Sequence, residues 1–206
     1  MRSLRDHLAT LLVCCMCLCF VPYSAAADGA SSSKLSVDGN PYFPLAVGTS
    51  WTYRCSIEGR PQFEKTLRLT SKVRQGDTSV YKGEQRTGRD SKPLLYYFTT
   101  DSSGKVYRSA SLDGKNRELL ITRAPKLGDK VGALHVAAAE QMKLDGIGQI
   151  EALRVEPYSI DDPALPAAKR AEWRAQFYAR DIGPVGEADG LGGECLITKL
   201  VKPKQP

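Results

Sequence analysis

Residues 41–58 have the sequence PYFPLAVGTSWTYRCSIE, and the second half of this stretch decides the fold class. From residue 51 onward, large or apolar side chains alternate with polar ones: Trp51, Tyr53, Cys55 and Ile57 are separated by Thr52, Arg54, Ser56 and Glu58. An alternation with a period of two is typical of a β-strand that has one buried and one solvated face. The stretch therefore predicts an amphipathic strand at the start of the ordered part of the chain.

The same alternation recurs along the chain in short segments that are separated by turn residues. Together the segments number about ten and cover residues 51–58, 63–74, 78–85, 94–100, 105–112, 117–123, 131–140, 148–158, 173–180 and 194–202. The links at 101–104 (DSSG) and 113–116 (DGKN) are polar and contain glycine, as hairpin loops require. We therefore predict an all-β domain, an antiparallel meander of about ten strands that forms a curved sheet, an open barrel or a sandwich.

The second segment also predicts which of its side chains face the core. Four apolar residues lie on one side of it, opposite the basic ones: Phe63, Leu67, Leu69 and Val73 face away from Arg68, Lys72 and Arg74. We therefore expect the four apolar side chains to be buried.

One segment, residues 162–173 (DPALPAAKRAEW), has a composition that favours a helix. Asp162 is a candidate cap, and Pro163 suits the first helical position. Pro166 would limit the helix to one or two turns, because proline lacks the backbone N–H donor. The two readings are therefore one short helix packed against the sheet or a surface loop.

The first 27 residues have the three parts of a secretory signal: Arg2 and Arg5, an apolar run over 8–21, and Ala25-Ala26-Ala27. The run is about 14 residues long, which is short of the roughly 20 needed to span a bilayer. An uncleaved anchor is the alternative. No cysteine of this region follows a small residue, so lipid modification is not expected. We predict a signal peptide over 1–27, a flexible linker over 28–40, a single β-rich domain over 41–206, and a periplasmic or secreted location.

Cleavage of this signal would remove four of the six cysteines and leave Cys55 and Cys195. An even pair in an oxidising compartment predicts a disulfide. Closing a loop of about 140 residues would stabilise the fold by roughly 5 kcal/mol. Two buried free thiols are the alternative. If the bond exists, the first and last strong strands must be neighbours or face each other across the core, because a disulfide needs Cα atoms within about 7 Å.

Three motifs resemble those of a known group of proteins. Residues 42–53 (YFPLAVGTSWTY) resemble the YFPLxxGxxWxY opening of a group of exported bacterial proteins of unknown function. Residues 125–129 (PKLGD) and 177–185 (FYARDIGPV) are similar to its P-x-x-G-D and closing YxxxxGxV elements, so the resemblance covers about 42–200. It implies a β-rich periplasmic or surface domain, likened to the open β-barrels of lipoprotein carriers, and it carries over no catalytic residues. The chain differs from lipidated members in lacking their modification signal.

The sequence offers no constellation for catalysis, metal binding or a cofactor. His135 is the only histidine after the predicted signal, which disfavours a zinc site and a Ser-His-Asp enzyme. Glu140, Asp145, Asp161 and Asp162 are candidates for a carboxylate-dependent hydrolase by residue type alone. No enzyme is therefore expected, and the hydrolase is the less favoured alternative.

The charge of the chain limits the class of partner. Its net charge is +6, and loss of Arg2, Arg5 and Asp6 with the signal would leave +5. The mild excess could favour anionic lipid or cell-wall polymer. Nucleic acid is not expected, because no basic stripe with interleaved aromatic residues is present. A transmembrane segment is not expected after the signal either.

Aromatic residues suggest where a ligand could bind. Six of them could line an apolar pocket between a curved sheet and residues 162–173: Trp51, Tyr53, Tyr96, Phe98, Trp173 and Phe177. Ordinary core packing is the alternative for the same residues. We therefore expect a non-enzymatic exported β-domain that binds an apolar ligand or an envelope protein or lipid. A structural or assembly role in the envelope, without a small ligand, is the alternative.

Overall fold

The computed structural model describes residues 40–57 and 60–203, which belong to one compact unit of the chain. The predicted signal peptide 1–27 and the linker residues 28–39 lie outside the described residues, as do 58–59 and 204–206. Within the described part, no helix is both long enough and apolar enough to cross a membrane.

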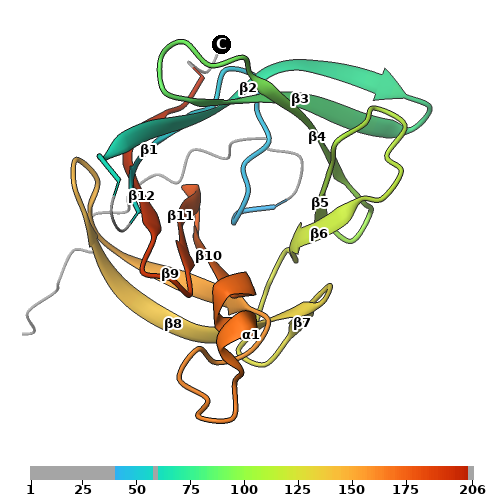
Figure 1. Cartoon of the computed structure of the whole chain (residues 1–206). Helices are drawn as coiled ribbons and strands as arrows, with labels where there is room; N and C mark the ends of the chain where they lie inside the picture. The colour runs from blue at the N-terminus through green and yellow to red at the C-terminus, as the bar shows by residue number, and fades with distance from the viewer. Residues whose placement is uncertain (1–39, 58–59, 204–206) are drawn as a thin grey trace, which may run out of the picture. The chain divides into compact units, whose positions relative to one another are not determined.

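Over these residues, twelve strands form a single antiparallel sheet, which confirms the all-β prediction (Figure 1). They are β1 Ser50–Ser56, β2 Phe63–Gln75, β3 Thr78–Thr87, β4 Leu94–Thr100, β5 Val106–Ser109, β6 Glu118–Ile121, β7 Lys130–Val131, β8 Leu134–Leu144, β9 Gly148–Glu156, β10 Arg174–Ala179, β11 Gly183–Asp189 and β12 Glu194–Val201. The count exceeds the expected ten because the predicted segment 131–140 is divided between β7 and β8, and because β11 was not predicted. β7 has only two residues, and the glycines and proline of β11 (GPVGEAD) lower its β propensity.

The sheet curves into a nearly closed barrel (Figure 1). Consecutive strands pair within β1–β6 and within β7–β12, and the pairing of β1 with β12 joins these two meanders. Among the described strands, β6 and β7 are consecutive in the chain without being hydrogen-bonded to each other, so they form the seam of the barrel. The two edges of the seam lie close together: a Cβ added at Gly132, just after β7, would lie 3.8 Å from the Cβ of Leu119 on β6.

Cys55 and Cys195 occupy directly opposed positions of β1 and β12 and form a disulfide. Their Cα atoms are 4.0 Å apart, although 140 positions separate them in the chain. One cysteine belongs to the β1–β6 meander and the other to the β7–β12 meander. The bond therefore links the two halves of the barrel at the side opposite the seam in strand order.

The first described residues pass through the inside of this barrel. Figure 1 shows the blue segment before β1 lying within the ring of strands. Phe43 and Leu45 of this segment are buried in the core. The Asn40 side-chain amide donates to the Gly104 carbonyl at 2.8 Å, and the Trp51 indole N–H donates to the Ile182 carbonyl at 2.6 Å. Part of the barrel interior is therefore filled by the chain's own segment 40–49.

Gly183 permits this segment to lie against β11. Its φ is +98°, and a Cβ there would come within 3.0 Å of Trp51 Nε1 and 3.1 Å of Pro44 Cδ. Glycine meets both requirements, because it has no side chain and tolerates positive φ. The glycine of the closing motif therefore touches the tryptophan and the proline of the opening motif.

A β-bulge corrects the expected orientation of Val73. The pairing of β2 with β3 shifts between Leu69 and Ser71. A bulge inserts one residue, so side chains beyond it point to the other face. Leu69 is buried as expected, whereas Val73 is 45% exposed.

The segment 162–173 does contain a helix, but it starts later than Asp162. α1 spans Ala167–Glu172 and begins directly after Pro166. The Asp162 carboxylate instead accepts from the Ala164 N–H at 2.9 Å, within the loop. The Trp173 indole donates to the Tyr158 carbonyl at 2.7 Å, which ties the end of α1 to the residues after β9.

Candidate functional site

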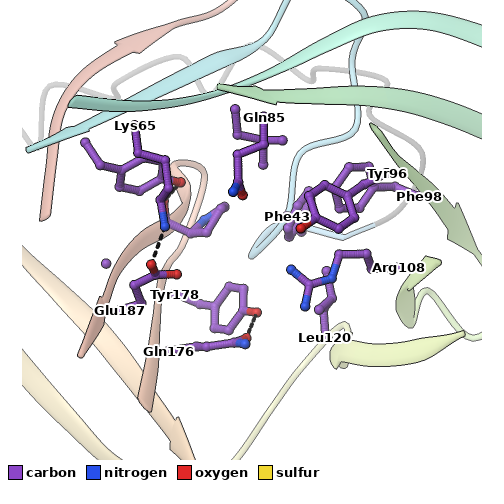
Figure 2. Close-up of a pocket in the computed structure, with 14 residues that line it drawn as sticks. Phe43, Lys65, Gln85, Tyr96, Phe98, Arg108, Leu120, Gln176, Tyr178 and Glu187 are labelled. Atoms are coloured by element: carbon purple, nitrogen blue, oxygen red, sulfur yellow. Dashed lines mark hydrogen bonds and ion pairs between the residues drawn. The ribbon is translucent and has the colours of Figure 1, made fainter. Parts of the chain in front are cut away.

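A half-open cavity of about 70 Å³ lies inside the barrel, between the segment 40–49 and walls from both meanders (Figure 2). We call it the interior pocket. Its walls come from β1 to β6 on one side and from β10 and β11 on the other. Residues far apart in the chain therefore meet there only because the barrel nearly closes.

The floor of the interior pocket is aromatic and apolar. Phe43, Phe98 and Leu120 are almost fully buried. The ring centroids of Phe43 and Phe98 are 5.2 Å apart, and those of Tyr96 and Phe98 are 6.5 Å apart. Such tilted contacts between aromatic rings are favourable and hold the rings in place.

Lys65 brings a charge into this interior. It lies on β2 between Phe63 and Leu67, so the pleat of the strand points it to the inner face. Its ammonium group forms an ion pair with Glu187 of β11 and lies 5.2 Å from the ring centroid of Tyr53 (Figure 2). The Lys65 side chain is 12% exposed and that of Glu187 is 52% exposed, so the carboxylate marks the mouth of the pocket.

Arg108 of β5 approaches from the opposite wall. Its Nη2 donates to Glu118 Oε2 at 2.6 Å, and its guanidinium lies 5.0 Å from the ring centroid of Tyr96. A guanidinium has five N–H donors, so one carboxylate does not use them all. Figure 2 shows the group directed toward the centre of the pocket, facing Tyr178.

Two buried phenols and two side-chain amides complete the polar lining. The Tyr178 hydroxyl donates to Gln176 Oε1, and the Tyr53 hydroxyl donates to the Pro184 carbonyl at 2.9 Å. Burial raises the pKa of both tyrosines, so both remain neutral hydroxyl groups near neutral pH. Gln85 extends its amide into the pocket from β3 (Figure 2).

The six aromatic residues proposed from the sequence divide into two groups. Tyr53, Tyr96 and Phe98 line the interior pocket. The other three are buried but do not line the pocket. The ring centroid of Trp51 lies 5.5 Å from that of Phe43, Trp173 directly follows α1, and Phe177 pairs with Gly186 between β10 and β11.

Sequence reasoning missed most of the polar lining, namely Lys65, Gln85, Arg108, Gln176 and Glu187, together with Phe43. A signal was present for some of them. Lys65 stands two residues from both Phe63 and Leu67, and Arg108 stands two residues from Val106. A charged residue in phase with the apolar face of a strand is the pattern that could have marked them.

The structure holds the candidate hydrolase carboxylates in separate local contacts. Asp145 pairs with Arg54 at 3.1 Å, Glu140 pairs with Arg154 at 2.9 Å, and Asp162 binds its own loop. None of these three lines the interior pocket, and neither does the exposed Asp161. Over residues 40–57 and 60–203, no group of three or more histidine, cysteine or acidic side chains is placed to hold a metal ion.

A second polar cluster lies on β8 and β9. Glu156 is only 2% exposed, and its Oε2 lies 3.3 Å from Arg154 Nε without a well-aligned hydrogen bond. Arg154 also holds Glu140, and His135 lies opposite Glu156 in the ladder. Burial raises the pKa of Glu156, and the neighbouring Arg154 opposes this shift.

Comparison with known proteins supports the fold and leaves the activity open. No family model and no curated protein sequence matches this chain. A protein of Bacteroides fragilis NCTC 9343, described as exported and as having a YmcC-like fold, superposes with a TM-score of 0.52 and 12% identity, covering 79% of this chain and 100% of that one. A protein of Parabacteroides distasonis ATCC 8503, described as a lipoprotein, gives a TM-score of 0.53 and 9% identity, covering 80% and 100%. At these identities the likeness shows a shared fold.

Proposed function

We propose that this chain is an exported, non-enzymatic binding domain that receives a small, uncharged polar group of a cell-envelope molecule in its interior pocket. One observation carries the proposal: the pocket joins an aromatic floor to several inward-pointing hydrogen-bonding side chains. Ligand sites combine apolar walls with a few placed polar groups in this way. The exported and lipoprotein descriptions of the structural neighbours support the envelope setting.

The size of the pocket defines how much of a ligand enters. A cavity of about 70 Å³ holds a few water-sized atoms, whereas pockets for whole small molecules enclose roughly 300 Å³ or more. Phe43 and Leu45 occupy neighbouring interior space. We therefore expect only the end of a larger molecule to enter, and we expect no fatty-acyl chain to be enclosed.

The test uses small probes of different charge and polarity on the isotopically labelled protein. Acetamide, acetate, methylammonium and dodecanoate are titrated separately, and NMR shifts are followed at the pocket residues Tyr96, Phe98 and Gln85. We expect acetamide to shift these signals in a saturable way. Enclosed dodecanoate, seen as contacts from its chain to Phe43 and Phe98, would overturn the proposal.

A pair of tryptophan substitutions controls for unspecific effects. Leu67→Trp fills the interior pocket, whereas Leu127→Trp adds the same ring at a site that is 64% exposed. We expect acetamide shifts to vanish in the first variant and to persist in the second. If wild-type signals at the pocket respond to none of the four probes, the structural role in the envelope becomes the better explanation.

A further inference from the structure

The charges around the interior pocket cancel one another in pairs. Lys65 is neutralised by Glu187, and Arg108 is neutralised by Glu118. A ligand anion would have to compete with a carboxylate for each cation, and a ligand cation would meet Lys65 and Arg108. A neutral group avoids both penalties and can still use their remaining N–H donors.

The lining also changes with depth. The floor consists of buried rings and Leu120, while the side chain of Glu187 at the mouth is 52% exposed. Gln85 and Gln176, which are partly buried, contribute amides from opposite sides of the pocket (Figure 2). A ligand that matches this lining has an apolar end against the floor. Next to that end it has a neutral group that both donates and accepts hydrogen bonds, and its remaining polar part lies outside the mouth.

The acetamido group meets each of these requirements. Its methyl can contact the rings of Phe43 and Phe98, its carbonyl can accept from Arg108 or Gln85, and its N–H can donate to a glutamine side-chain oxygen. Its four non-hydrogen atoms suit a cavity of about 70 Å³. A hydroxyl-rich ring attached to it would remain at the mouth, beside Glu187.

Resting on the proposed function, we infer that the interior pocket binds the acetamido group of an N-acetylated sugar. The sugar ring stays at the mouth, where its hydroxyls donate hydrogen bonds to the Glu187 carboxylate. The glycan is bound by its side group and is not cleaved.

Three trisaccharides with the same linkage test this inference on the mature protein by calorimetry: those of N-acetylglucosamine, glucosamine and glucose. They differ at one ring position, which carries an acetamido, a charged amino or a hydroxyl group. We expect the N-acetylated trisaccharide to bind at least about tenfold more tightly than the other two, as the gain of hydrogen bonds to charged or buried groups implies.

Two arginine variants make a matched comparison, because each guanidinium lies over a tyrosine ring. Arg108 stacks on Tyr96 inside the pocket, whereas Arg117 stacks on Tyr107 at 4.4 Å and does not line it. We expect Arg108→Met and Gln85→Leu to weaken binding by about tenfold. Arg117→Met should bind like the wild type, with melting temperatures showing that all variants fold.

The outcomes separate this inference from the proposed function. Equal binding of the glucose trisaccharide, or tightest binding of the charged glucosamine one, would overturn the acetamido assignment. If no trisaccharide binds while free acetamide still shifts the pocket signals, the sugar assignment is wrong and the proposed function stands. If acetamide also fails, both are wrong.

Discussion

Gly83 on β3 lies directly against Phe98, a residue of the floor of the interior pocket. A Cβ added there would lie 2.5 Å from Phe98 Cε2 and 3.4 Å from Leu67 Cδ1. The Phe98 ring is packed between Phe43 and Tyr96, so it has little freedom to move away. Glycine is therefore required by close approach and not by a positive φ.

The first prediction concerns this contact. We expect Gly83→Ala to lower the free energy of unfolding by about 1–3 kcal/mol, as overpacking of a filled core does. Urea denaturation measures the change, with the exposed Thr87→Ala of the same strand as a control. Combining Gly83→Ala with Phe98→Leu should cost less than the sum of the two single changes. Simple additivity would show that the ring is not the obstacle.

At the scale of the element, β9 ends on a buried acid. Glu156 lies among Arg154, His135, Glu140 and Asp161, and burial raises its pKa against the opposing effect of Arg154. A raised pKa in the folded state means that ionisation of Glu156 opposes folding. Its contribution to stability is therefore fully present below the ordinary glutamate pKa and is lost as the pH rises through the raised value.

The second prediction follows from the upward direction of the Glu156 pKa shift. We expect Glu156→Gln to gain stability relative to the wild type as the pH rises from the ordinary glutamate pKa toward neutrality. Thermal unfolding across this range measures the difference. The same comparison in a His135→Gln background removes the imidazole that faces Glu156 across the ladder. A difference that does not vary with pH would contradict the prediction.

The strands also show which features follow from the local sequence pattern and which depend on tertiary contacts. The period of two placed Phe63, Leu67 and Leu69 on the inner side of β2, and the same pattern carried Lys65 inward with them. It failed at Val73, because a bulge near Leu69 shifts the register. β11 could not be predicted locally, since its glycines and proline form a strand only between β10 and β12.

For the whole molecule, the strand order makes two halves that are joined at one side and merely touch at the other. The β1–β12 ladder and the Cys55–Cys195 bond join them, whereas the seam between β6 and β7 lacks a ladder. The chain crosses the seam through the loop 122–129. A break in this loop should therefore leave the paired strands intact.

The third prediction uses a protease site inserted after Ala124 in that loop. We expect cleavage to preserve the β-sheet circular dichroism spectrum. Electrophoresis should give one band without reductant and two bands with it, because the disulfide holds the halves together. A matched site in the turn 76–77 between β2 and β3 serves as a control, because cleavage there also leaves one cysteine of the disulfide in each fragment. Loss of the spectrum on cleavage after Ala124 alone would show that the seam loop is essential.

The sequence by itself determined the all-β class, the inward face of several strands and the pair of cysteines available for a bond, because alternation and residue counts are local properties of the chain. It identified Tyr53, Tyr96 and Phe98 of the pocket, since large aromatic residues are recognisable wherever they occur. The tertiary structure alone decided that Lys65 meets Glu187, that residues 40–49 fill part of the barrel and that the pocket is small and partly polar. Those features depend on the pairing of the first strand with the last, and the chain's local pattern carries no information about which distant strands become neighbours.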